Sequence, residues 1–388
     1  MSRARSAASA VVVLAFLCSS ALGAQGTSGR TLEFTGLVLV NGFSNSNTVN
    51  NSDVPQFVVP DTATRRGGLG GTARQSRLGV FLTQPDVLGG TFSGEVDVDF
   101  YGGQLGNGGR TMPVLRLRRL VGRVNWRRAE VMVAQEAPLV TEINPRSLGS
   151  VGTPGFVTAG NLWFWMPQIR GTVEFGEGVR VGVQGAVIAP MTGDAQGTFT
   201  TQPDAAEKSD RPFLQGRVRI AWGDPSDGNE IGVGVHQGWF VESDTSLHSS
   251  QAIAVSGRAR FGIAEIRGEW YTGQGLAALG GGGIGRNLSP VDGQPLEDQA
   301  GWVQLNLRPR SVWEIGAGVG YDEPKSAQLD DADPAQRLRN LAWAVYTTWQ
   351  PAGPILLGFE YRRIETEYGG ATGTLTNDHF NLAAGFRF

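Results

Sequence analysis

The last stretch of the chain, NDHFNLAAGFRF at residues 377–388, decides the fold. It alternates between two sets of residues: Phe380, Leu382, Ala384, Phe386 and Phe388 on one face, and His379, Asn381, Ala383, Gly385 and Arg387 on the other. A period of two predicts a β-strand with one apolar and one polar face. Because an unpaired terminal strand would leave a sheet edge open, we expect it to pair with the first strand and close a barrel.

The same period recurs along the chain in segments bounded by Gly, Pro, Asn and Asp clusters. Sixteen segments qualify: residues 31–42, 73–83, 90–101, 114–126, 129–137, 162–175, 179–189, 213–222, 230–241, 250–261, 264–274, 299–308, 312–322, 338–350, 355–367 and 378–388. Most exceed the roughly five or six residues of an ordinary strand and match the roughly 9–11 residues of a tilted strand that crosses a bilayer.

The connections between these segments alternate in length. The short ones are residues 127–128, 176–178, 262–263, 309–311 and 351–354, and the long ones are 43–72, 138–161, 190–212, 275–298 and 323–337. Short turns on one side and long loops on the other are typical of outer-membrane barrels. We therefore predict an all-β fold, a 16-stranded antiparallel transmembrane β-barrel with short periplasmic turns and long extracellular loops.

The first residues have the pattern of a secretory signal. Arg3 and Arg5 precede a short apolar core at residues 11–17, and small residues follow at 21–23. We expect residues 1–24 to be the signal peptide and residues 25–388 the barrel, located in a Gram-negative type of outer membrane. The only cysteine, Cys18, lies in that segment, so we expect no disulfide in the mature protein.

Tryptophans are placed near the ends of the predicted strands. Trp126, Trp222, Trp313 and Trp349 are near short turns, whereas Trp163, Trp165, Trp239 and Trp302 are near long loops. Aromatic residues gathered at both ends predict two interfacial girdles. The apolar faces between the girdles would then meet lipid, and the charged faces would line the interior.

Charged residues on the predicted inner faces are candidates for lining a pore. They are Arg77, Glu95, Asp97, Asp99, Arg116, Arg118, Arg119, Arg123, Arg170, Arg217, Arg219, Arg258 and Arg260. In an unbroken strand Arg116 and Arg118 would face the opposite side from Arg119 and Arg123. Since an arginine facing lipid costs about 2–4 kcal/mol at mid-depth, we predict a β-bulge near Arg118 and Arg119. The alternative is that Arg119 or Arg123 reaches the interface along its flexible stem.

A barrel of this size encloses more space than its wall side chains fill, so we expect a hydrated lumen. Fixed arginines there would attract anions, unless cross-strand carboxylates neutralise them. Residues 138–161 form the long connection after the fifth predicted strand, with Glu142, Asn144 and Arg146 as candidate constriction residues. The alternative for this segment is an ordinary surface loop.

Three stretches carry a resemblance to a known group: RQSRLGVFLT (74–83), GEVDVDFYGG (94–103) and VLRLRRLVGRVNW (114–126). With the architecture and the terminal phenylalanine, they make the chain resemble sixteen-stranded trimeric outer-membrane porins, and among these the DcaP-like porins. The resemblance implies passive diffusion of small hydrophilic solutes, anions among them, without a cofactor. It also implies a homotrimer in outer-membrane lipid and recognition of the last strand by the barrel-insertion machinery.

Two other functions remain open on the sequence. A barrel hydrolase needs a base beside a nucleophile, and the chain offers only His236, His248 and His379 and no G-x-S-x-G turn. A surface adhesin or structural barrel would use its loops, which are of modest length. We expect no metal site in the acidic loop with Asp330, Asp331 and Asp333, and no nucleic-acid binding, since no basic domain is present.

Overall fold

The computed structural model describes residues 29–60, 67–102, 113–191, 203–223, 228–242 and 246–388. The expected signal peptide, residues 1–24, lies outside them. The strands are β1 (Thr31–Asn45), β2 (Gly68–Thr72), β3 (Arg77–Val87), β4 (Gly90–Gly102), β5 (Val114–Asn125), β6 (Ala129–Glu136), β7 (Met166–Gly176), β8 (Val179–Ile188), β9 (Phe213–Trp222), β10 (Asn229–Val241), β11 (Leu247–Phe261), β12 (Ala264–Gln274), β13 (Glu297–Arg310), β14 (Trp313–Pro324), β15 (Arg337–Trp349), β16 (Ile355–Tyr368) and β17 (Thr374–Arg387).

Among the described residues, helical structure is confined to single turns in the connections. They are η2 (Glu207–Ser209), η3 (Ala277–Leu279), α2 (Gly282–Gly285) and η4 (Ser326–Gln328). No helix among the described residues is long and apolar enough to cross a bilayer.

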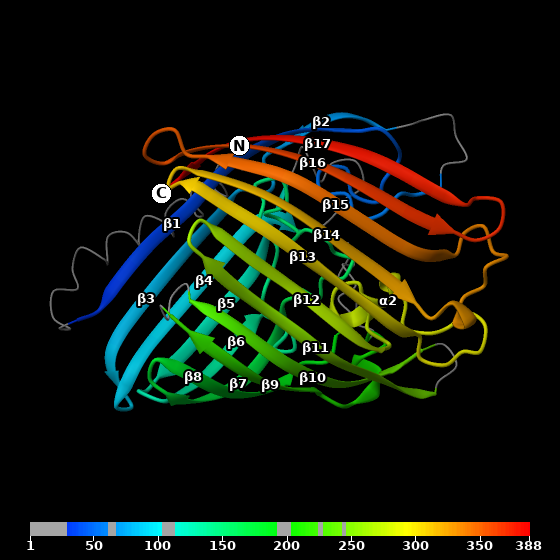
Figure 1. Ribbon diagram of the computed structural model, residues 1–388. Coiled ribbons are helices and arrows are strands. Elements are labelled where there is room, and N and C mark those ends of the chain that lie inside the picture. The colour runs from blue at the N-terminus through cyan, green and yellow to red at the C-terminus, as the bar shows by residue number, and fades with distance from the viewer. Residues whose placement is uncertain (1–28, 61–66, 103–112, 192–202, 224–227, 243–245) are drawn as a thin grey trace, which may run out of the picture.

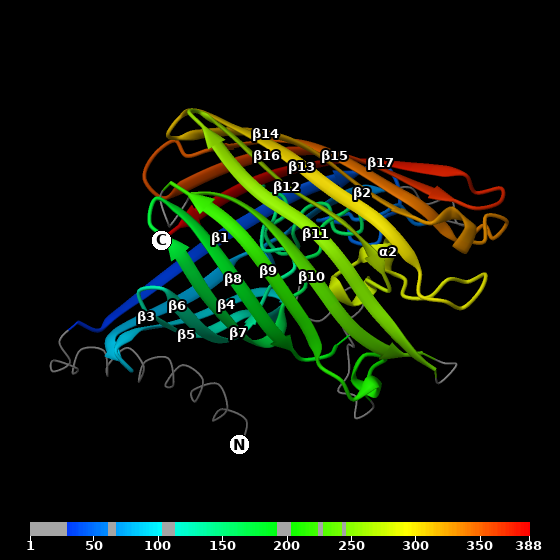
Figure 2. The same ribbon diagram turned by 60° about the horizontal axis from the view of Figure 1, so that its bottom comes forward.

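The strands form one closed antiparallel barrel of sixteen strands, as predicted (Figures 1 and 2). Two of the labelled strands, β2 and β3, pair one after the other along the same edge of β1, so together they make one strand of the barrel wall. The other edge of β1 pairs with β17, from Leu37 opposite Arg387 to Asn45 opposite His379. Closure between the first and last strands is therefore confirmed.

Several strand boundaries differ from the sequence prediction. The strand predicted at residues 73–83 begins only at Arg77 and runs to Val87, and residues 68–72, predicted as part of a long loop, form β2. The strand predicted from residue 162 begins only at Met166, because Trp163 N and Phe164 N donate to Leu279 O, at 3.1 and 3.5 Å, instead of to a neighbouring strand. Residues 162–165 consequently belong to the long loop that precedes β7.

The barrel wall has an apolar outer face and a largely polar inner face. In β9, the apolar Leu214, Val218 and Ile220 are exposed outward, while Gln215 and Arg217 are buried inside. The same alternation places Phe380, Leu382 and Phe386 outside and His379 and Asn381 inside. An exposed apolar belt around a polar interior is the arrangement that a bilayer requires of a barrel.

The girdle predicted at the long-loop end is wrong for three of its four tryptophans. Trp302 shares its face with the inward Gln304, is 3 % exposed and donates to Glu269 Oε2 at 3.4 Å. Trp163 is buried and donates to Gly280 O at 2.9 Å, and Trp165 belongs to the same interior loop. At the short-turn end, Trp313 and Trp349 are exposed as expected.

The expected hydrated lumen is also corrected in part, because loops fill the interior toward the long-loop end. Leu139, Val140 and Leu162 of one loop and Leu276 and Leu279 of another form a buried apolar cluster against the inner wall. Residues 51–58 insert beside β15–β17, where Val58 N donates to Thr366 Oγ1 at 3.0 Å. Space for water is therefore concentrated toward the short turns.

Candidate pore and its lining

A β-bulge in β5 turns four arginines toward the interior. Arg119 lies opposite Asp97 and Leu117 lies opposite Val98, so Arg118 is an extra residue between them. The register shift confirms the predicted bulge. Without it, Arg119 and Arg123 would face the apolar exterior, at the cost of placing charge in lipid.

These arginines pair with carboxylates on neighbouring strands. Arg116 donates to Asp99 from Nε and Nη2, at 3.0 and 2.6 Å, and Arg118 Nε lies 3.3 Å from Asp99 Oδ2. Asp97 is shared in the same way by Arg77 and Arg118. Arg119 reaches Glu95 at 2.6 Å and also pairs with Glu136.

We call this group the β3–β6 wall. Its members are Arg77, Arg116, Arg118 and Arg119 with Glu95, Asp97, Asp99 and Glu136. Four arginines face four carboxylates, so the wall is electrically balanced. Of the two readings that the sequence allowed, mutual neutralisation describes this part of the barrel.

A second group, the β7–β11 wall, has fewer carboxylates than arginines. It comprises Arg170, Glu174, Arg180, Arg217, Arg219, Glu230 and Arg258, with Glu142 of the long loop. Each of its three carboxylates is shared by two arginines. Among the described residues of this wall, five arginines stand with three carboxylates, so the described part carries an excess of positive charge. The remaining candidate, Arg260, pairs with Glu265 at 2.9 Å farther along the wall.

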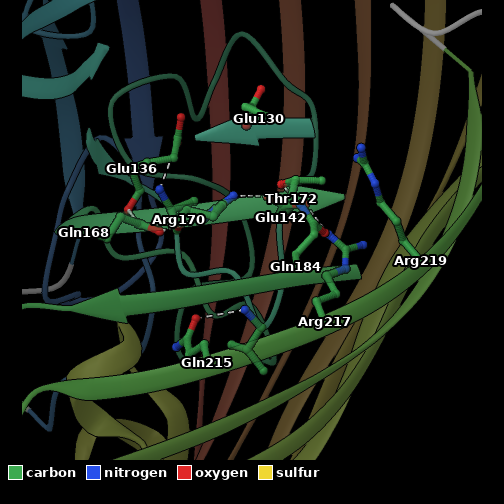
Figure 3. Close-up of polar contacts among 12 residues, drawn as sticks. Glu130, Glu136, Glu142, Gln168, Arg170, Thr172, Gln184, Gln215, Arg217 and Arg219 are labelled. Atoms are coloured by element: carbon green, nitrogen blue, oxygen red, sulfur yellow. Dashed lines mark hydrogen bonds and ion pairs between the residues drawn. The ribbon is translucent and has the colours of Figure 1, made fainter. Parts of the chain in front are cut away.

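Glu142 anchors the long loop to this wall. Figure 3 shows its carboxylate between Arg170 and Arg217, and Arg217 Nη1 donates to Glu142 Oε2 at 2.5 Å. Burial raises the pKa of the Glu142 carboxyl, but the two guanidinium groups outweigh burial and hold that pKa below its ordinary value. The anchor is therefore ionised at neutral pH.

The loop itself, residues 137–165, crosses the interior of the barrel. Arg146 N and O bond to the amide of Gln304 on β13, at 2.8 and 2.9 Å. Asn144 O accepts from Arg267 Nη1 on β12 at 2.9 Å. The backbone of Leu148 is bound by Asn41 on β1 at 3.0 Å. In Figures 1 and 2 the teal backbone of this loop lies inside the ring of strands.

Inward-facing glycines make room for this loop. A Cβ on Gly234 of β10 would lie 2.3 Å from Val140 O, and one on Gly320 of β14 would lie 2.2 Å from Ala159 O. Glycine in a strand commonly marks such a close approach of another backbone. The alternating glycines of residues 314–320, EIGAGVG, were the available signal, and the sequence interpretation did not use it.

Beneath the loop lies a cavity of about 1380 Å³ that reaches the short-turn end of the barrel. Among the described residues that line it, six are glutamates and thirteen are arginines: Arg77, Arg118, Arg119, Arg123, Arg127, Arg128, Arg146, Arg170, Arg180, Arg219, Arg258, Arg308 and Arg387. Both lysines of the chain, Lys208 and Lys325, lie outside it.

The predicted pore residues divide into two sets. Those that line this cavity are Arg77, Arg118, Arg119, Arg123, Glu142, Asn144, Arg146, Arg170, Arg219 and Arg258. The others, Glu95, Asp97, Asp99, Arg116, Arg217 and Arg260, face inward without being part of its lining. Sequence reasoning missed Trp165, which it assigned to a girdle, and the turn residues Arg127 and Arg128.

The interior histidines have structural partners. His236 lies between Gln215 and Ser250, with ring nitrogens 3.0 and 3.1 Å from their side chains. A serine beside a histidine is the start of a hydrolytic arrangement. Here both side chains are buried, and neither belongs to the cavity lining. Within the described ranges, no three His, Cys, Asp or Glu side chains gather as a metal site.

The comparisons with known proteins bear on the fold. No protein-family model matches the sequence, and no curated protein matches it at a significant level.

Solved structures do match the barrel. The outer-membrane channel DcaP of Acinetobacter baumannii has a TM-score of 0.69 at 16 % identity, over 94 % of this chain and 99 % of that one. An anion-selective porin from Comamonas acidovorans has a TM-score of 0.58 at 14 % identity, over 92 % of this chain and 100 % of that one. Salmonella typhi OmpF, in a complex with daunomycin, has a TM-score of 0.57 at 9 % identity, over 93 % of this chain and 98 % of that one. The chain therefore has the sixteen-stranded barrel fold of outer-membrane porins.

Proposed function

We propose that this protein is an outer-membrane porin, a passive diffusion channel for small hydrophilic solutes that prefers anions. The observation that carries the proposal is the lining of the cavity under residues 137–165, where thirteen arginines stand against six glutamates. Fixed positive charge in a narrow hydrated passage concentrates anions and repels cations. The porin fold and the loop across the lumen agree with this function.

Arginine suits this task better than lysine. Its guanidinium stays charged at any physiological pH and offers several donors in one plane, so carboxylate and phosphate groups bind along it in two-point contacts. Residues 138–161, with Glu142, Asn144 and Arg146, act in this proposal as the constriction loop. The residues of the β3–β6 and β7–β11 walls form the pore wall around it.

Location and assembly follow from the same proposal. The exposed apolar belt would lie in outer-membrane lipid after removal of residues 1–24 as a signal peptide. The DcaP-like and OmpF-like architecture supports a homotrimer, and the terminal strand would be recognised by the insertion machinery. No cofactor has a part in passive diffusion.

Reconstitution in planar lipid bilayers under a salt gradient tests the proposal. We expect stepwise, ohmic conductance, and a reversal potential whose sign shows that anions permeate more readily than cations. Complete electrical silence of the folded protein would refute the channel and favour an adhesive or structural barrel. A reversal potential of the opposite sign would refute the anion preference and leave the channel standing. Heat-unfolded protein is the control for leakage.

A further inference from the structure

We propose that the narrowest point of the channel is a layer made by the indole of Trp165 and the guanidinium groups of Arg116 and Arg118. The proposal rests on the porin function and adds a residue that determines what passes. Trp165 belongs to the loop, whereas Arg116 and Arg118 belong to β5, so the layer joins the loop to the wall.

The contacts within the layer are direct. The guanidinium carbon of Arg118 lies 4.7 Å from the centre of the Trp165 ring, and that of Arg116 lies 5.2 Å from it. Both cations are attracted to the face of an indole, by about 0.5–2 kcal/mol each. Asp99 holds the two arginines together from behind. The bulge in β5 contributes Arg118 to this contact.

Trp165 is also supported by Trp163. The centres of the two rings are 4.9 Å apart and their planes are at 83°, an edge-to-face contact. Trp163 is in turn fixed by its hydrogen bond to Gly280 O. Trp165 is therefore in contact with both Trp163 and the two arginines, which fix its position.

The cavity ends at this layer. Trp165 and Arg118 are part of its lining, but Arg116, one step farther toward the long-loop end of β5, is not. Arg116 is nevertheless 23 % exposed at its side chain, so solvent reaches it although it is not part of the cavity lining. In the proposal, the layer of Trp165, Arg116 and Arg118 is the boundary between the cavity and the solvent that reaches Arg116.

The tip of the loop closes the space beside the layer. Val151 N and Gly152 N donate to Gln75 Oε1, at 2.8 and 3.0 Å, and Gly152 O accepts from Arg116 Nη2. A Cβ on Gly152 would lie 2.4 Å from the Tyr101 ring, so the backbone sits directly on the wall. In the proposal a solute passes at the layer, since the loop backbone rests against the wall beside it.

Single-channel recordings of Trp165→Ala and Trp302→Ala test the proposal. Trp302 is the matched control, since it is an interior tryptophan that contacts the same loop, through Phe156, without lining the cavity. The narrowest section dominates the resistance of a pore, so we expect Trp165→Ala to raise the unit conductance at least about twofold and Trp302→Ala to leave it unchanged. Trp165→Phe should fall between wild type and Trp165→Ala.

Thiol modification provides a second readout in folded channels. The only native cysteine, Cys18, lies in the expected signal peptide. In Trp165→Cys, the thiolate attacks an anionic methanethiosulfonate reagent, a disulfide forms and sulfinate leaves. We expect conductance to fall on modification, and no change in Trp302→Cys.

Two results would overturn the proposal. Equal conductance of wild type and Trp165→Ala, together with no effect of the reagent, would place the narrowest point elsewhere and leave the porin function intact. Absence of conductance in wild type itself would refute the porin function and this proposal with it.

Discussion

The β3–β6 wall and the β7–β11 wall use the same residue types with different stoichiometry. The first balances four arginines with four carboxylates. The second shares three carboxylates among its arginines and recruits one of them, Glu142, from the loop. Balanced charge gives a rigid wall with little net field, whereas unbalanced charge gives a field and also a place to attach a loop. Arginine content alone would not have distinguished them.

The largest expected effect comes from unbalancing the β3–β6 wall at its most buried carboxylate. Asp99 is fully buried between Arg116 and Arg118. We expect Asp99→Asn to cost about 3 kcal/mol of unfolding free energy, since breaking a buried ion pair costs about 3–5 kcal/mol and asparagine still accepts hydrogen bonds. Denaturant titration of the barrel in detergent measures this value. A loss below half of it would mean that solvent screens the pair.

A matched pair of substitutions, Arg119→Gln and Arg219→Gln, compares the two walls directly. Their side chains are 27 % and 24 % exposed, and each pairs with two glutamates. A unit charge at about 4 Å in water is worth about 1 kcal/mol, or about fivefold in local ion concentration. We expect both variants to lose anion preference by up to about that factor.

Only Arg119→Gln should also create a site that favours cations. Counted over the described residues, it leaves the β3–β6 wall with one carboxylate in excess, whereas four arginines and three carboxylates remain in the β7–β11 wall after Arg219→Gln. Reversal potentials measure the preference, and block by a divalent cation reports the new site. Equal block of both variants would contradict the distinction between the walls.

The smallest effect is expected for the partly exposed ion pair between β5 and β6. Arg123 lies 3.5 Å from Glu130, and both side chains are partly exposed. Such pairs contribute about 0–1 kcal/mol, so Arg123→Gln should leave the denaturation midpoint nearly unchanged. The same denaturant titration used for Asp99→Asn provides the measurement. A loss of unfolding free energy as large as that of Asp99→Asn would show that the exposure of an ion pair does not determine how much it stabilises the barrel.

The strands could be predicted because lipid on one side and a polar interior on the other impose a period of two on every crossing. The same constraint predicted the bulge, since Arg119 and Arg123 could not face lipid. It also held the information that Trp302 faces inward, because Trp302 shares its parity with Gln304 and Asn306. The girdle prediction considered only distance from the strand ends.

The path of the loop could not be predicted in the same way. The position of the loop depends on its contacts with Gly234, Gly320 and Gln304, which lie far away in sequence and meet the loop only once the strand register of the barrel is set. The sharing of Glu142 depends equally on where the loop lies. Trp165 therefore looked like an interfacial residue until the three-dimensional arrangement placed it against Arg118.

Closure between β1 and β17 has a consequence for the order in which the protein folds. Gly36 and Phe388 exchange two backbone hydrogen bonds, at 2.8 and 3.0 Å, across nearly the whole length of the chain. Contacts of such high sequence separation form slowly, because a long loop must close before they contribute. β1 therefore cannot complete its pairing before β17 has been synthesised. Until then both strands keep an open edge, and open strand edges pair readily with other chains.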